Sequence, residues 1–226
     1  MDVKEIIIYL KKNSKEENRI GMARYGINVE NALGCSIPLL RDIAKQHKNN
    51  HELALELWNT GFHEARILAT MVDDAKKVDV TQMESWVKDF DSWDLCDQCC
   101  SNLFEYTTDA WKKSLEWVER KEEFVKRAGF VLMACFSVHD KKAGDEKFIP
   151  LLDLIKKHST DERNMVKKAV NWALRQIGKR NKKLNPIAIS YAEQILQIDS
   201  KTAKWIATDA LRELKSEKIQ NKINKK

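Results

Sequence analysis

The chain has 226 residues, of which 43% are hydrophobic and 33% are charged, and its formal net charge at pH 7 is +6. With only 7 Gly and 3 Pro, and with many Ala, Leu, Lys and Glu, the composition favours helices and excludes a turn-rich β-sheet protein. The apolar runs fall short of the roughly 18 residues that a membrane-spanning helix needs, so we expect no membrane partner.

The N-terminus and the cysteines bear on the compartment in which the protein works. In MDVKEIIIYLKK, lysines flank an apolar core of four residues, which is too short for a signal peptide. The five cysteines are odd in number and lack the spacing of a disulfide framework, which indicates reduced thiols. We therefore expect a cytoplasmic protein.

The chain divides into helices of about 10–18 residues that are separated by short polar breaks, as in packed helix pairs. Ser159 and Glu162 have the spacing of a capping box for the helix that follows them. Asp199 or Ser200 is placed to cap the last long helix. The Lys-rich tail over 215–226 is expected to fray.

Four helical segments share one pattern, in which polar residues are followed by Ala and large apolar residues at helical spacing. Ala128 and Ala169 are 41 residues apart, and Ala169 and Ala207 are 38 apart. Periods of roughly 40 residues with two helices per unit are typical of HEAT and armadillo repeats. We therefore predict an all-α, HEAT-like or armadillo-like solenoid with a concave basic face, as a single domain over 1–214. A plain irregular helical bundle is the alternative. The four segments are 64–72, 125–134, 166–175 and 202–214.

Charge is unevenly distributed along the chain. Residues 156–226 contain 18 Lys and Arg against 7 Asp and Glu, whereas the rest of the chain contains 22 against 27. This asymmetry indicates an anionic partner for the C-terminal half, and nucleic acid is the commonest such partner. A solvated basic surface without a partner is the alternative.

The helix predicted over 163–179 has two distinct faces. At 100° per residue, one face is apolar, and the opposite face places a tryptophan among three cations. Either Trp172 packs against a neighbouring helix, or it presents an aromatic face beside phosphate-binding cations. The apolar face consists of Val166, Ala169, Val170, Ala173, Leu174 and Ile177, and the polar face of Lys168, Trp172, Arg175 and Lys179.

The segment DSWDLCDQCC at 91–100 contains a second candidate site. Trp93 and Asp97 are four residues apart, which makes them neighbours on one helix face, at the edge of an apolar arc. A half-sheltered carboxylate beside an aromatic ring is suited to stabilising a cation. Alternatively, Asp97 is favoured by the helix dipole and Trp93 belongs to the edge of the core. The apolar arc consists of Leu95, Cys96, Cys99, Cys100 and Leu103, and its cysteines fit a core better than a zinc site.

Arg127 is the third candidate, in the helix predicted over 123–136. Its side chain is expected to point about 110° away from the core face, at the rim of the helix. An arginine at that position can bind a phosphate through two hydrogen bonds, and a surface salt bridge is the alternative.

These segments, taken in order, resemble the AlkD-type DNA alkylation repair family of DNA glycosylases. The resemblance runs from about residue 20 to residue 214, and the Trp-x-x-x-Asp and Trp-x-x-Arg-Gln segments at their separation are its most specific part. The residues that carry it are MARYGI at 22–27, PLLR at 38–41, LWNTGFHEARILA at 57–69, SWDLCD at 92–97, VKRAGFVLM at 125–133 and NWALRQIGKRN at 171–181.

The resemblance implies HEAT-like repeats around double-stranded DNA and excision of positively charged N3- or N7-alkylated purines. It implies that the lesion is not flipped into a pocket, and that neither a metal nor another cofactor takes part. It assigns catalysis to Trp93, Asp97 and Trp172. Tyr25, Arg127 and Arg175 correspond to DNA contacts, to which the cationic stripe adds Lys168 and Lys179.

Two functions follow from the sequence. The first is a monomeric glycosylase that acts on alkylated duplex DNA, with cations that contact the backbone without reading base sequence. The second is a catalytically inactive HEAT-repeat module that binds nucleic acid or an acidic protein. The second function leaves the combination of Trp93, Asp97 and Trp172 unexplained.

Overall fold

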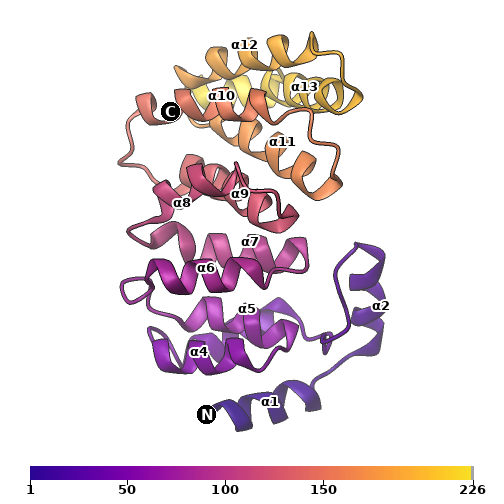
Figure 1. Cartoon of the computed structure of the whole chain (residues 1–226), viewed down its shortest axis with the longest axis vertical. Helices are drawn as coiled ribbons and strands as arrows, with labels where there is room; N and C mark the ends of the chain where they lie inside the picture. The colour runs from indigo at the N-terminus through magenta and orange to yellow at the C-terminus, as the bar shows by residue number, and fades with distance from the viewer. Residues whose placement is uncertain (225–226) are drawn as a thin grey trace. The chain divides into compact units, whose positions relative to one another are not determined.

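Figure 1 shows a computed structural model of the chain, which describes residues 1–224. All regular structure in this range is helical, as the composition predicts, and none of these helices is long and apolar enough to cross a lipid bilayer. The α-helices are α1 (Val3–Lys12), α2 (Glu16–Arg24), α3 (Ile37–Ala44), α4 (His51–Asn59), α5 (His63–Val72), α6 (Val80–Lys88), α7 (Trp93–Asn102), α8 (Ala110–Trp117), α9 (Glu123–His139), α10 (Ile149–Lys157), α11 (Asn164–Gly178), α12 (Leu184–Leu196), α13 (Lys201–Leu214) and α14 (Glu217–Asn224). Two 3₁₀ turns, η1 (Phe104–Tyr106) and η2 (Asp145–Lys147), lie between them.

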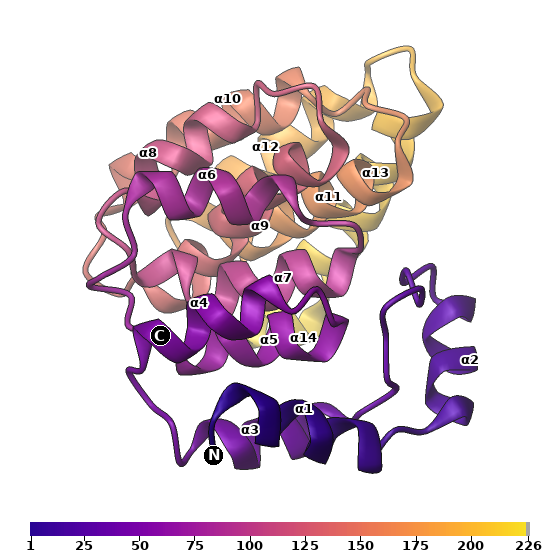
Figure 2. The same ribbon diagram turned by 60° about the horizontal axis from the view of Figure 1, so that its bottom comes forward.

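The chain folds into two compact units, an N-terminal unit over Met1–Ala110 and a C-terminal unit over Trp111–Lys226. The four segments of the predicted repeat are α5, α9, α11 and α13. In the N-terminal unit α5 packs against α4 and α7, and Figure 2 shows α4 and α5 side by side. In the C-terminal unit α9, α11 and α13 pack one upon the next, and Ala128, Ala169 and Ala207 are all buried. The predicted repeat spacing is confirmed.

Aromatic side chains join the helices of the N-terminal unit. Trp58 of α4 and Trp86 of α6 stack with ring centroids 3.9 Å apart and an interplanar angle of 4°. The indole N–H of Trp58 donates to Asp89 Oδ2 at 2.8 Å, and the guanidinium of Arg66 from α5 lies over the same ring. Because both indoles are buried, this stack holds α4 and α6 together, and Arg66 adds a contact from α5.

Helix α2 is held by the chain around it, since none of its own residues is buried. Figures 1 and 2 both show α2 standing apart from α4 and α5. Residues 25–36, here called the strap, connect α2 to α3. Side chains of α2 bind the strap directly: Asn18 donates to the carbonyl of Gly34 at 2.7 Å, and Arg19 to that of Val29 at 3.2 Å.

The strap is anchored in turn by one buried carboxylate of α5. Glu64 is 1% exposed, and its two oxygens accept the backbone N–H groups of Leu33, Gly34 and Cys35 at 2.6–3.1 Å. Gly34 has a φ of +77°, and a Cβ there would lie 2.1 Å from the carbonyl oxygen of Lys15. A side chain at position 34 would therefore prevent the turn that presents these three donors.

In the C-terminal unit an arginine closes the end of α9. The last carbonyls of a helix have no partner within the helix and need another donor. The guanidinium of Arg180, which follows α11, donates to the carbonyls at this end at 2.7–3.4 Å and so ties α11 to α9. The carbonyls belong to Phe136, Ser137, Asp140 and Ala143.

Of the two predicted helix caps, one is confirmed and one is wrong. The side chain of Ser200 accepts the N–H of Ala203 and caps α13. Ser159 does not cap α11, which begins at Asn164 without a side-chain cap. The hydroxyl of Ser159 instead donates to the carbonyl of Lys156 at 2.8 Å, at the end of α10. A serine shortly after a helix can satisfy the preceding carbonyls as readily as the following amides.

The prediction of a frayed tail after residue 214 is wrong for its described part, which forms α14. Ile219 and Ile223, four residues apart, are buried at 6% and 3% exposure. The side-chain amide of Gln220 donates to the carbonyl of Leu214 at 2.7 Å and to Asn185 Oδ1 at 3.1 Å. The helix is held by two buried isoleucines on one face and by the two hydrogen bonds of Gln220. Residues 225–226 of the tail lie outside the described range.

Substitution of Gly129 tests the contact between α8 and α9. A Cβ at this position would lie 2.7–2.9 Å from Val118 and from the carbonyl oxygen of Ser114, which includes backbone atoms that cannot rotate away. We expect Gly129→Ala to lower the free energy of unfolding by about 1–3 kcal/mol, measured by thermal unfolding. Gly21→Ala is the matched control, because nothing lies within 4 Å of its added Cβ, and an unchanged or raised stability is expected there.

Substitution of Glu64 tests the anchoring of the strap. An amide in place of the carboxylate turns an NH₂ group toward the backbone N–H donors, from which it cannot accept a hydrogen bond. We therefore expect Glu64→Gln to lower the free energy of unfolding by about 1–3 kcal/mol. Hydrogen exchange should show lost protection at the amides of 33–35, while the exposed Glu56→Gln leaves them protected. Equal protection in the two variants would show that the strap is held by other contacts.

Candidate functional site

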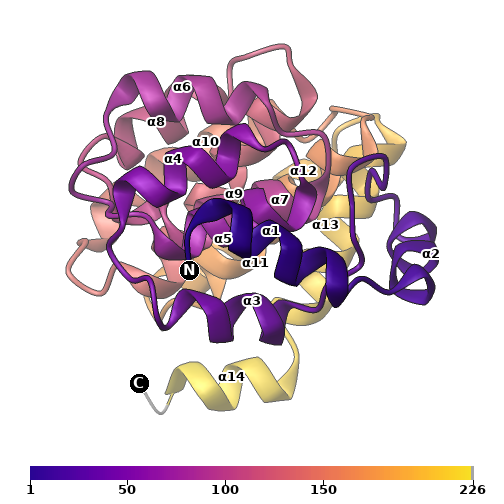
Figure 3. The same ribbon diagram turned by 90° about the horizontal axis from the view of Figure 1, so that it is seen from below.

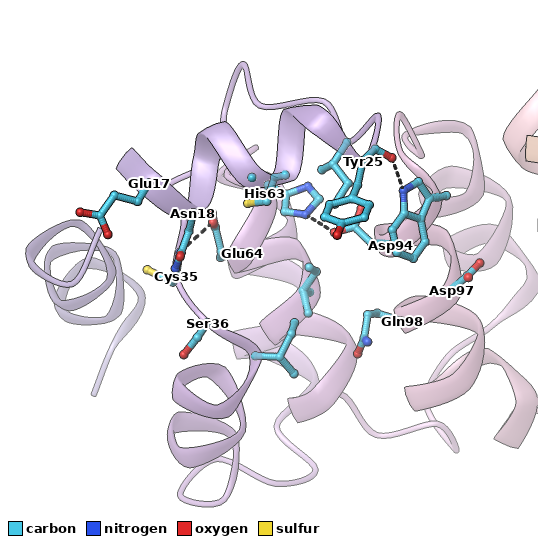
Figure 4. Close-up of a pocket in the computed structure, with 16 residues that line it drawn as sticks. Glu17, Asn18, Tyr25, Cys35, Ser36, His63, Glu64, Asp94, Asp97 and Gln98 are labelled. Atoms are coloured by element: carbon cyan, nitrogen blue, oxygen red, sulfur yellow. Dashed lines mark hydrogen bonds and ion pairs between the residues drawn. The ribbon is translucent and has the colours of Figure 1, made fainter. Parts of the chain in front are cut away.

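A cavity of about 590 Å³ lies within the N-terminal unit. Its walls come from α2, the strap, the first residue of α3, α5 and α7, and most of its lining is apolar. Figure 4 shows Glu17 of α2 at one end of the cavity and Asp97 of α7 at the other, with His63 and Glu64 of α5 between them. The cavity therefore depends on the strap, which holds α2 opposite α7.

Trp93 and Asp97 both line this cavity from α7. Trp93 is the first residue of the helix and Asp97 lies one turn later, and both are half-buried, as the four-residue spacing predicts. The indole N–H of Trp93 donates to the backbone carbonyl of Tyr25 at 3.0 Å. This bond fixes the orientation of the indole, while its ring remains partly exposed. The predicted apolar arc of α7, Leu95, Cys96, Cys99, Cys100 and Leu103, is buried.

Tyr25 contributes to the cavity in two ways. It is the first residue of the strap, and its backbone carbonyl orients Trp93. Its own side chain is 76% exposed, although it lines the cavity. A large aromatic side chain that is so exposed next to a cavity marks a candidate contact surface.

The pair His63 and Asp94 lies beside Trp93 and is not apparent from the sequence. His63 Nε2 is 2.9 Å from Asp94 Oδ2, and the imidazole is 5% exposed. Burial alone would lower the pKa of His63, but the hydrogen bond and charge of Asp94, with the charges of Glu64 and Asp91, outweigh it and raise the pKa. The other oxygen of Asp94 is buried without a hydrogen-bond partner among residues 1–224. An acidic residue in the first turn of a helix is common, so the sequence gives no signal that Asp94 pairs with a histidine 31 residues earlier.

Cys35 is the cavity residue whose chemistry is most restricted. Burial and the charge of Glu64 raise the pKa of its thiol to about 11, and the thiol donates to the carbonyl of Leu10 at 3.2 Å. A thiol with this pKa is protonated at neutral pH and is a poor nucleophile. Cys35 is therefore excluded as a nucleophile of this cavity at neutral pH.

The predicted two-faced helix is α11, in the C-terminal unit, and its apolar face is buried throughout. On the other side Trp172 is half-buried and Lys168 is exposed. Arg175 and Lys179 both bind Glu213 of α13, with nitrogen–oxygen distances of 2.6 and 2.7 Å. Burial alone would raise the pKa of Glu213, but the hydrogen bonds and charges of these two cations outweigh burial, so the pKa is lowered. Two of the three predicted cations are thus already paired within the unit.

Arg127 does not lie at the rim of α9, and that prediction is wrong. Its side chain is 5% exposed, and Nη1 donates to the carbonyl of Met165 at 2.6 Å. The prediction fails because every residue of α9 from Arg127 to Ser137 is buried, so this part of the helix has no exposed rim. Arg127 therefore joins α9 to the first turn of α11.

The comparison with solved structures shows the fold. One structure matches with a TM-score of 0.79 and 21% sequence identity, over 94% of this chain and 95% of the other. It is described as a new family of proteins related to the HEAT-like repeat DNA glycosylases, with affinity for branched DNA structures. The prediction of an all-α, HEAT-like repeat fold is confirmed. An engineered protein matches with a TM-score of 0.39 and 16% identity over 78% of this chain and 90% of its own, which is too low to support an inference.

A search of curated proteins finds no match to this chain. The comparison with protein families does find one: the model of the DNA alkylation repair enzymes matches residues 6–214. This range contains the cavity, α7 and α11, and it covers nearly the whole chain. The resemblance noted in the sequence is thus confirmed, and the chain belongs to the family of DNA alkylation repair enzymes.

Proposed function

We propose that this protein is a DNA glycosylase that excises positively charged N3- or N7-alkylated purines from duplex DNA. Membership of the DNA alkylation repair family and the HEAT-like fold support this proposal. The observation that carries it is the pair Trp93 and Asp97, an oriented indole and a carboxylate one turn apart on the wall of a cavity.

The chemistry of the substrate explains why these two groups suffice. Alkylation at N3 or N7 makes the purine a cation, so the base needs no proton in order to leave. The bond between C1′ and N9 breaks, and its electron pair neutralises the departing base. The sugar is left as an oxocarbenium ion, whose positive charge is larger in the transition state than in the bound substrate. Groups that attract this charge therefore accelerate the reaction.

Trp93 and Asp97 are such groups. The negative face of an indole attracts a cation, and a carboxylate in a half-sheltered site does so more strongly than one in water. Water then forms a bond to C1′ and loses a proton, for which Asp97 is the acceptor in this proposal. The products are the free alkylated base and an abasic sugar. The lesion need not be flipped from the helix, because only its sugar has to meet these groups.

For the C-terminal unit, the family resemblance gives Trp172 the role of a second indole. Lys168, which is exposed, is assigned to the DNA backbone. Arg175 and Lys179 are also assigned there, and a phosphate would have to displace Glu213 from them. A phosphate is also an anion, so both cations would keep a negatively charged partner after that exchange. Contacts of this kind position DNA without reading its sequence.

A second candidate function is binding of branched DNA without catalysis. It is favoured by one observation, that the similar solved structure is described as having affinity for branched DNA structures. This function would use the same fold, but it would leave the orientation of Trp93 beside Asp97 without a purpose. It predicts tighter binding to a DNA junction than to a duplex, together with no release of alkylated base.

The substitution Asp97→Asn tests the proposed chemistry. The wild-type protein should release 7-methylguanine or 3-methyladenine from methylated duplex DNA, measured by chromatography of the free bases. Loss of the carboxylate should lower the single-turnover rate by at least about 100-fold, with DNA affinity nearly unchanged.

Asp42→Asn is the matched control, because Asp42 belongs to the same unit, is exposed and lies outside the cavity. Its rate should equal that of the wild type. Full activity of the Asp97 variant would refute the mechanism, and absence of release by the wild-type protein would refute the glycosylase function itself.

Substitutions of Trp93 test the role of the indole face. A desolvated cation–π interaction is worth about 2 kcal/mol, or about 30-fold in rate. We expect Trp93→Ala to lower the single-turnover rate by about this factor, and Trp93→Phe to lower it less, because phenylalanine keeps an aromatic face. Tyr106→Ala removes another exposed aromatic ring of the N-terminal unit, away from this cavity, and should have no effect. Equal rates for the two Trp93 variants would mean that the ring does not act on the sugar.

A further inference from the structure

A second cavity, of about 730 Å³, lies within the C-terminal unit and is strongly basic. It is formed by the ends of α9 and α11, by Glu213 at the end of α13, and by α14. Five cations and one carboxylate line it, and it is here called the basic cleft. These residues are Lys141, Lys179, Arg180, Lys218, Lys222 and Glu213.

Two of the five cations have partners that account for their presence. Lys179 binds Glu213, and Arg180 donates to the carbonyls at the end of α9. The other three have no such explanation. Lys141 donates to the carbonyl of Val138, while Lys218 and Lys222 form no ion pair with residues 1–224. All three are exposed, so the cleft has an excess of positive charge that the unit does not balance.

The placement of Lys218 and Lys222 is fixed by the way α14 is docked. Figure 3 shows α14 as the last helix of the chain, joined to α13 by a short connection. Ile219 and Ile223 bury one side of the helix, and Gln220 bonds it to the last residue of α13 and to α12. Lys218 and Lys222 are four residues apart and thus share a face that borders the cleft.

This arrangement is unfavourable for stability and therefore points to a ligand. Like charges four residues apart on a helix repel each other, and Lys141 adds a third charge to the same cleft. Helix α14 also lies beyond residue 214, where the match to the family model ends. Its lysines are accordingly not explained by what the family model covers.

We propose that the basic cleft binds phosphates of the DNA backbone. The choice of DNA rests on the proposed function, since the charge alone would suit any polyanion. Lysine binds phosphate as a mobile point charge, which suits a backbone that is to be held without reading its bases. The contact adds α14 to the DNA-binding surface of the C-terminal unit.

The double substitution Lys218→Gln/Lys222→Gln tests this proposal. Binding to undamaged duplex DNA is measured by fluorescence anisotropy over a series of salt concentrations. Each lost phosphate contact lowers the salt slope by about 0.9, so the slope should fall by about 1.8, with affinity on the order of tenfold weaker at low salt. Thermal unfolding should show no loss of stability, because the substitution removes a repulsion.

Lys112→Gln/Lys121→Gln is the matched control, because it removes the same charge from two exposed lysines outside the cleft. If both double variants lose the same affinity, only net charge matters and the proposal is wrong. It is also wrong if the cleft variant binds DNA as the wild type does, which would favour an acidic protein as the partner.

Base release distinguishes this proposal from the glycosylase function. At low concentrations of methylated DNA the cleft variant should release base more slowly than the wild type, in proportion to its loss of DNA affinity. If the wild type releases no base but the cleft variant still loses affinity and salt slope, the glycosylase function fails and the phosphate contact stands. If the wild type releases base and the cleft variant binds DNA normally, the glycosylase function stands and the phosphate contact fails.

Discussion

The site in the N-terminal unit depends on one buried carboxylate. Glu64 satisfies three consecutive backbone N–H groups of the strap, and these bonds compensate for the burial of its charge. The strap in turn holds α2, which buries nothing of its own, and presents the carbonyl of Tyr25 to the indole of Trp93. A cavity wall and the orientation of a proposed catalytic ring thus follow from a single side chain of α5.

The cations of the C-terminal unit divide by burial into those that hold the fold and those that are able to meet DNA. Arg127 is buried and donates to the carbonyl of Met165, and Arg180 donates to carbonyls at the end of α9, so both cations stabilise the fold. Arg175 and Lys179 are partly buried and share Glu213, whose carboxylate a phosphate could replace as the anionic partner. The excess of positive charge that the sequence shows after residue 156 therefore overstates the charge available to a ligand.

Helical periodicity predicted the features that depend on a single helix. The two faces of α11 and the adjacency of Trp93 and Asp97 on α7 both follow from 3.6 residues per turn. Features that depend on a second element could not be predicted in this way. Arg127 is buried and bonded to Met165 of α11, and no pattern within α9 indicates this contact. Likewise, nothing near Glu64 in the sequence indicates that its partners are amides about 30 residues earlier.

The groups around Trp93 favour a substrate whose leaving base is already positively charged. An unmodified purine leaves readily only if an acid protonates it, and His63 is the one imidazole in the cavity lining. That imidazole is 5% exposed and bonded to Asp94, so it has neither the access nor the freedom to deliver a proton to a base in duplex DNA. A cationic, alkylated purine needs no such acid. In the proposed function, the indole of Trp93 and the carboxylate of Asp97 provide what the reaction of such a base still lacks, which is stabilisation of the positive sugar.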